Sequence, residues 1–154
     1  MKINVYSLDK AEQIANGGNW ISIRDIGFEH LYKAIDENAD NILKLYFDDV
    51  SPYSVSHGMI YPFYEEQFKK RCPVYFDDGM ASDIYEWALG KDEINIHCFA
   101  GISRSQSIAH VINVFFNCLC GKEDDFIRNI PDFSMVNPYV FNIMMNVFKK
   151  RICG

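Results

Sequence analysis

The segment from residue 97 to residue 105, HCFAGISRS, places a thiol and a guanidinium in one short stretch of small residues. Five residues separate Cys98 from Arg104, the apolar run EINIHC precedes the loop, and helically spaced apolar residues follow it. A strand, a tight loop and a helix N-terminus in this order can direct several backbone N–H groups at one anion. The segment therefore predicts a phosphate-binding loop.

The residue types in this loop suit phosphoryl transfer. Cys98 is the candidate nucleophile, because the helix dipole and Arg104 both stabilise a thiolate, and its attack on a phosphoryl group gives a phosphocysteine. The planar guanidinium of Arg104 can hold two phosphate oxygens. Ser105 is expected to donate to the sulfur and make it a better leaving group. His97 is expected to order the loop by hydrogen bonding rather than to act as a base.

Taken singly, each of these residues has an ordinary structural explanation. A lone cysteine usually lies in a core, a lone arginine on the surface and a lone glycine in a turn. Here Gly101 relaxes the backbone of the loop, and Ala100 and Ser103 keep its rim small. Their combination with the cysteine and the arginine favours a catalytic loop.

The rest of the chain predicts the elements that position this loop. Apolar runs favour strands at residues 3–8, 20–26, 41–47 and 93–98, with an extended segment at 74–76. Helical patterns occupy residues 28–39, 62–71 and 79–89, a stretch from Arg104 that ends at Gly121, and residues 122–129 and 138–150. Alternating strands and helices predict an α/β domain with a mainly parallel central sheet flanked by helices. Ligands bind beyond the carboxyl ends of such strands, where the loop would lie.

Composition limits the possible partners. The 154 residues suit one domain, and the net charge of −6 argues against a broad nucleic-acid surface or a polybasic membrane anchor. The N-terminus lacks a signal-peptide pattern, and no apolar run reaches the roughly 20 residues that span a bilayer. Five cysteines without framework spacing favour free thiols and a cytoplasmic location, with Cys118 and Cys120 in the core. No metal or organic cofactor is expected.

The loop HCFAGISRS resembles the signature of the cysteine-dependent protein tyrosine phosphatases, His-Cys-x5-Arg-Ser/Thr, and AGISRS is most similar to the dual-specificity branch. WISIRDIG, ILKLYFDDV, DIYEWAL and VNPYVFNIMMNVF extend the likeness, to small bacterial and viral members, over about residues 20–148. The resemblance implies a phosphatase-like fold over residues 1–154, with 51–75 as an insertion or variable loop. It also implies that Cys98 is the nucleophile, that Arg104 binds the phosphate as a clamp, and that Ser105 assists hydrolysis of the phosphoenzyme. The phosphate cradle would comprise the backbone of Phe99, Ala100, Gly101, Ile102 and Ser103.

The same family supplies a proton to the leaving oxygen from an aspartate on another loop. Two stretches offer one: YFDDV at 46–50 and YFDDG at 75–79. Asp49 is preferred, because it follows a clear strand as in the family pattern. Asp48 stays a candidate, as do Asp77 and Asp78, although an aspartate at a helix start is normally an N-cap.

The expected function is hydrolysis of phosphotyrosine, and of phosphoserine or phosphothreonine, in phosphorylated proteins or peptides. An inositol-lipid or RNA 5′-phosphatase would use the same loop, but the loop has no lysine for further phosphates. A catalytically inactive phosphoprotein-binding module would keep the loop, and a rhodanese-like sulfur carrier would use its cysteine without needing the arginine. The physiological substrate, the preferred phosphoresidue and the oligomeric state stay open.

Overall fold

Four short apolar segments form one sheet in the computed structural model, which describes residues 1–118 and 136–153. The strands, which lie in the spatial order β1-β4-β2-β3, are β1 (Lys2–Ser7), β2 (Asn19–Arg24), β3 (Asn41–Tyr46) and β4 (Glu93–Cys98). All three strand pairings are parallel, and Ser7 lies opposite Cys98 in the register of β1 and β4. The four strands predicted from the apolar runs are therefore confirmed to within two residues at each end.

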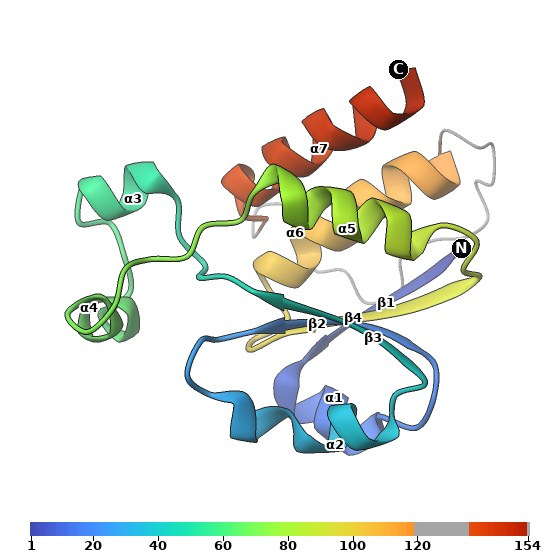
Figure 1. The fold of residues 1–154 in the computed structure, drawn as a ribbon, viewed down its shortest axis with the longest axis horizontal. Coiled ribbons are helices and arrows are strands. Elements are labelled where there is room, and N and C mark those ends of the chain that lie inside the picture. Colours follow the sequence, from blue (N-terminus) through green and yellow to red (C-terminus); the bar gives the residue numbers. More distant parts are fainter. Residues whose placement is uncertain (119–135, 154) are drawn as a thin grey trace.

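Helices cover both faces of the sheet, as a parallel sheet requires. On one face lie α1 (Leu8–Ile14) and α2 (Lys33–Asn38), and on the other lie α5 (Asp78–Ala88), α6 (Arg104–Asn113) and α7 (Pro138–Cys153) (Figure 1). The larger core packs α5, α6 and α7 against side chains such as Ile21 and Ile96, and the smaller one includes Trp20 and Ile35 beside α1 and α2. The predicted α/β domain is confirmed.

Several elements differ from the sequence-based expectations. The first strand ends at Ser7, whose Oγ accepts a hydrogen bond from Lys10 N at 3.3 Å and caps the unpredicted helix α1. The predicted helix over 28–39 is divided into a 3₁₀ turn, η1 (Glu29–Tyr32), and α2. After α6 the chain continues as a π-helical turn, η2 (Val114–Cys118), and Cys118 is exposed rather than in the core. Cys120, the predicted helix end at Gly121 and the helix over 122–129 lie outside the described residues.

Residues 51–75 contain two short helices, α3 (Pro52–Ser56) and α4 (Pro62–Phe68), of which the sequence pattern predicted only the second. Both lie beyond the end of β3, to the side of the two helical layers (Figure 1). The segment connects β3 to α5 and therefore starts at the edge of the sheet where all four strands end.

None of the helices in the described ranges has the length and apolar character needed to cross a membrane.

Candidate active site

The loop between β4 and α6 curls around the thiol of Cys98. Cys98 is the last residue of β4, and only 2% of its surface is exposed. The N–H of Gly101 donates to Cys98 Sγ at 3.2 Å, and Ser105 Oγ lies 3.1 Å from the same sulfur. Hydrogen-bond donors around a sulfur stabilise its anionic form. The loop therefore surrounds the thiol with groups suited to a thiolate.

Gly101 allows the loop to pack directly against the end of β1. Its φ is +73°, and a Cβ at this position would lie 2.7 Å from Ser7 N and from the carbonyl of Tyr6. Both the backbone conformation and the contact exclude a side chain. Two further hydrogen bonds hold the loop, from Leu8 N to Phe99 O at 3.0 Å and from Gln106 Nε2 to Gly101 O at 2.9 Å.

Arg104 begins α6 and is 4% exposed. Its Nη1 donates to Phe47 O at 2.9 Å and lies 2.9 Å from Asp25 Oδ1. Burial opposes the positive charge, yet neighbouring groups that include Asp25 raise the pKa of Arg104 above its usual value, so the side chain stays cationic. Its buried Nε has no hydrogen-bond partner among the described residues. Since buried polar groups are nearly always paired, this N–H is suited to a bound ligand.

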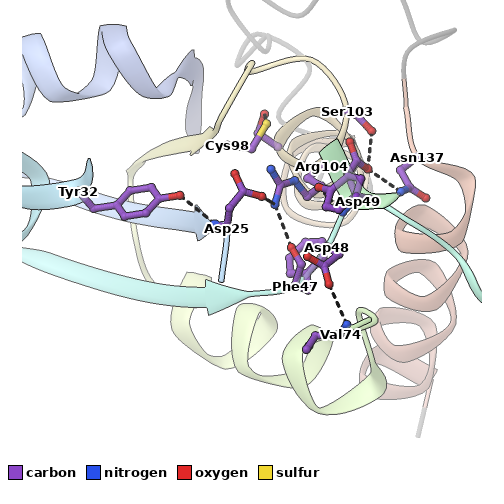
Figure 2. Close-up of polar contacts among 12 residues, drawn as sticks. Asp25, Tyr32, Phe47, Asp48, Asp49, Val74, Cys98, Ser103, Arg104 and Asn137 are labelled. Carbon is purple, nitrogen blue, oxygen red and sulfur yellow. Dashed lines mark hydrogen bonds and ion pairs between the residues drawn. The ribbon is translucent and has the colours of Figure 1, made fainter. Parts of the chain in front are cut away.

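Asp25 is a site residue that the sequence analysis missed. It directly follows β2 and is 6% exposed, its N–H donates to Tyr32 Oη at 2.8 Å, and its carboxylate pairs with Arg104. Figure 2 shows Asp25 and Arg104 side by side near Cys98. The segment IRDIG held a usable signal, because an aspartate after a parallel strand lies at the same sheet edge as the cysteine loop.

Of the four candidate acids, Asp49 lies at the cysteine loop. Its Oδ1 accepts hydrogen bonds from Ser103 Oγ at 2.9 Å and from Asn137 Nδ2 at 2.7 Å. Its N–H donates to Tyr64 Oη at 2.8 Å. Both side-chain bonds go to Oδ1, and Oδ2 accepts none within the described part of the chain. Hydrogen bonds to Oδ1 therefore fix the carboxyl group of Asp49 beside the cysteine loop.

Asp48 and Asp77 have structural contacts, and Asp78 lies away from the cysteine loop. Asp48 is fully buried, accepts two hydrogen bonds from Arg71 at 2.6 and 2.7 Å, and accepts a third from Val74 N at 2.8 Å. It points towards Val74 in Figure 2. Asp77 caps α5 by accepting a bond from Met80 N at 2.8 Å, as expected for an aspartate at that position. Asp77 and Asp78 are exposed and do not line the cavity that contains Cys98.

His97 lies on the opposite face of β4 from Cys98. Its Nε2 is 2.7 Å from Ser22 Oγ on the neighbouring strand, and its ring packs beside those of Trp20 and Tyr32. Burial lowers the pKa of His97 to about 3, so the imidazole is neutral near pH 7. This hydrogen bond ties β4 to β2 just before the loop begins, and the ring does not reach the thiol face.

Two more contributors to the site, Tyr64 and Asn137, were not anticipated. Tyr64 is a 4% exposed residue of α4, and burial raises the pKa of its hydroxyl, which is therefore neutral and holds the backbone of Asp49. Asn137 precedes α7, and its Oδ1 accepts hydrogen bonds from Tyr139 N and Val140 N. An Asn-Pro pair is a typical helix start, so the capping role of Asn137 fits the sequence. No feature of the neighbouring sequence predicted that Asn137 also donates a hydrogen bond to Asp49.

Asp25, Asp49, Tyr64, Cys98 and Arg104 line one cavity of about 600 Å³. Its base holds the buried Cys98, Arg104 and Asp25, whereas exposed apolar side chains surround its mouth. The apolar and aromatic lining residues are Phe28, Leu31, Tyr61, Phe63, Tyr64, Phe99 and Ile102, and Ala100 and Ser103 complete the loop side. A charged base with an aromatic entrance can bind an anionic group attached to an apolar body.

In comparisons with known proteins, no family model matches this chain, and no significant match was found among curated proteins or solved structures.

Proposed function

We propose that this protein is a cysteine-dependent phosphatase of the dual-specificity type, which hydrolyses phosphoric monoesters through a phosphocysteine at Cys98. The observation that carries the proposal is the loop around this thiol. The Gly101 N–H and the Ser105 hydroxyl approach the sulfur, and the Nε of the buried Arg104 beside it is unpaired among the described residues. This set of donors suits a thiolate and a tetrahedral dianion at the same place.

In the first step, Cys98 Sγ attacks phosphorus, so that an S–P bond forms while the P–O bond to the leaving group breaks. Asp49 gives its proton to the leaving oxygen. In the second step, water attacks phosphorus, Asp49 takes a proton from it, and the S–P bond breaks to release phosphate. The Ser105 hydroxyl, 3.1 Å from the sulfur, stabilises the departing thiolate.

Arg104 supports both steps by holding the phosphoryl oxygens. Phe47 O and Asp25 engage its Nη1, and within the described part of the chain Nε has no partner and is left for the substrate. A guanidinium fixed in this way needs little reorganisation as charge develops in the transition state. Asp25 is therefore assigned as a positioning residue.

The proposed substrates are phosphorylated proteins or peptides, with no cofactor and no nucleic-acid or membrane partner. The aromatic mouth of the cavity supports a phosphotyrosine side chain, and Arg104 is the only basic residue among its described lining residues. An inositol polyphosphate would need more positive charge than this. The proposal includes a cytoplasmic location, because a thiolate nucleophile stays active only where thiols are kept reduced.

The direct test compares the native chain with Cys98→Ser in hydrolysis of an aryl phosphate. The native chain should release phosphate, and the variant should lose activity by about 10⁴-fold or more, since its nucleophile is gone. Acid quenching of the native reaction should trap phosphorus bound to sulfur. Phosphopeptide binding without hydrolysis by the native chain would point to a binding module, and activity retained by Cys98→Ser would remove the nucleophile from Cys98.

A further inference from the structure

We propose that a second cavity beside the catalytic one binds an apolar side chain that flanks the phosphorylated residue in a protein substrate. This inference rests on the proposed phosphatase function and specifies its substrate. The second cavity has a volume of about 620 Å³ and lies between α3, the α3–α4 connection and the start of α7. It shares Asp49, Tyr61 and Ser103 with the catalytic cavity, so the two adjoin at the loop.

The lining of the second cavity favours apolar ligands over anionic ones. Asp49 is the only charged residue among the described residues that line it, and its carboxylate already accepts hydrogen bonds from Ser103 and Asn137. Most of the remaining surface comes from apolar and aromatic side chains, which include Val50, Pro52, Tyr53, Met59, Tyr61 and Tyr139. An apolar group gains the most by leaving water for such a surface.

Exposed hydrophobic side chains concentrate around the two cavities. Of the nine large hydrophobic residues that are exposed in the described chain, seven line one cavity or both, and Leu89 and Ile152 are the two exceptions. Leu31, Phe63, Phe99 and Ile102 line the catalytic cavity, Tyr53 and Met59 line the second one, and Tyr61 lines both. Contiguous apolar patches of this kind mark interaction sites. The patch continues past the catalytic cavity, which favours a polypeptide ligand over a small phosphate ester.

The position of the second cavity matches the dimensions of a peptide. Consecutive Cα atoms lie about 3.8 Å apart, so a residue one or two positions from the phosphorylated one reaches a cavity that shares a wall with the first. Tyr53, Met59 and Tyr61 come from the segment 51–75, which connects β3 to α5. This segment would therefore determine which phosphoproteins the enzyme prefers.

The test measures kcat/KM for phosphopeptides that carry Leu, Phe, Gly or Asp at each of the two positions on either side of the phosphorylated residue. Leu or Phe at one of these positions should raise kcat/KM by about 10- to 100-fold over Asp, the range expected for burial of such a side chain. Met59→Asp and Tyr53→Ala should abolish this preference. Both variants should hydrolyse p-nitrophenyl phosphate at the native rate, because neither residue lines the catalytic cavity.

Ile152→Asp is the matched control, since Ile152 is similarly exposed and lies away from both cavities. It should keep the native peptide preference, and thermal melts should show that all three variants fold. Equal kcat/KM for all flanking residues, or a preference that survives Met59→Asp and Tyr53→Ala, would overturn the inference while leaving the phosphatase intact. Failure of the native chain to hydrolyse any phosphate ester would instead overturn the proposed function.

Discussion

At the scale of single residues, the thiol of Cys98 depends on the backbone at Gly101. The glycine N–H points at the sulfur, and the residue packs against the carbonyl of Tyr6 and the N–H of Ser7. Any other residue would need both a left-handed backbone and space that β1 already occupies. The thiol environment and the end of β1 are therefore a single packed unit.

Gly101→Ala should disrupt this unit. Gly90→Ala is the matched control, because Gly90 has the same φ of +73° but nothing within 4 Å of its Cβ position. Both variants should lose about 1 kcal/mol of unfolding free energy from backbone strain. Gly101→Ala should lose further stability and about 100-fold or more of its aryl phosphatase kcat/KM, because the loop must move. Denaturant unfolding and steady-state kinetics measure the two effects, and equal activity of the two variants would contradict this view of the loop.

The choice of general acid leads to a second residue-level prediction. Asp49→Asn should lower kcat by about 10²- to 10⁴-fold for a phosphotyrosine peptide, whose leaving oxygen needs a proton. The loss should be much smaller for an activated aryl phosphate, whose leaving group departs unprotonated. Leaving-group dependence therefore identifies the acid more clearly than the absolute rate does.

Asp48→Asn provides the comparison. It removes a buried charge that pairs with Arg71, so it should lower the unfolding free energy by about 3 kcal/mol. Any loss of kcat relative to the native protein should be the same for the phosphotyrosine peptide and the activated aryl phosphate. A leaving-group effect in Asp48→Asn, or its absence in Asp49→Asn, would reverse the assignment of these neighbouring aspartates.

At the scale of elements, the three residues that directly follow β3 make three different contacts. Phe47 O accepts from Arg104, Asp48 pairs with Arg71, and Asp49 faces the cysteine loop. One short segment therefore supports both the clamp and the acid, through the backbone carbonyl of Phe47 and the side chain of Asp49. The helices α4 and α7 then hold Asp49 from two sides, through Tyr64 and Asn137.

Tyr64→Phe tests the contribution of α4 to the site. The change removes the acceptor for Asp49 N–H and keeps the ring, which packs against Phe63 and Phe68. The unfolding free energy should fall by about 1 kcal/mol, and kcat for a phosphotyrosine peptide should fall more than kcat for an activated aryl phosphate. Tyr53→Phe, which changes an exposed hydroxyl, is the control for both measurements. Equal losses with the two substrates would show that α4 does not position the acid.

At the scale of the whole molecule, the sheet separates two cores with different chemistry. The larger core reaches Cys98, whereas the smaller core packs Trp20 and Tyr32 against His97. A neutral imidazole with a pKa of about 3 is part of this packing. Protonating it would place a charge between the sheet and the α1–α2 layer, which burial makes unfavourable.

His97 therefore affects the pH dependence of stability. Its folded pKa of about 3 lies below the roughly 6.5 of an unfolded chain, so between these values the unfolded state binds more protons. Stability should fall as the pH drops from 6.5 towards 3, by up to about 1.4 kcal/mol per pH unit from this group. His97→Gln should show a shallower slope in urea unfolding between pH 6.5 and 4.5, whatever its stability at pH 7. Parallel slopes would mean that His97 titrates normally in the folded protein.

The amino-acid sequence by itself predicted the four strands, most of the helices and the loop from Cys98 to Ser105. These features depend on local causes: apolar periodicity, helix-start and helix-end residues, and a thiol and a guanidinium six positions apart around a tight turn. Helix α1 was missed because a seven-residue helix carries little periodic signal, although Ser7 is a good N-cap. The roles of Cys98, Arg104 and Ser105 stay predictions until activity is measured.

Only the tertiary structure decided which distant residues meet this loop. Asp25 follows β2 and Asp49 follows β3, and the strand order β1-β4-β2-β3 brings both to the edge where β4 ends. Asn137 precedes α7 and reaches this edge through its hydrogen bond to Asp49. Nothing in YFDDV distinguishes Asp48 from Asp49, because the difference lies in partners 23 and 54 residues away, Arg71 and Ser103. The second cavity likewise arises where α3 and α7 come together. Local sequence determines local geometry, whereas these contacts depend on how a parallel sheet is ordered and covered, which the whole chain decides.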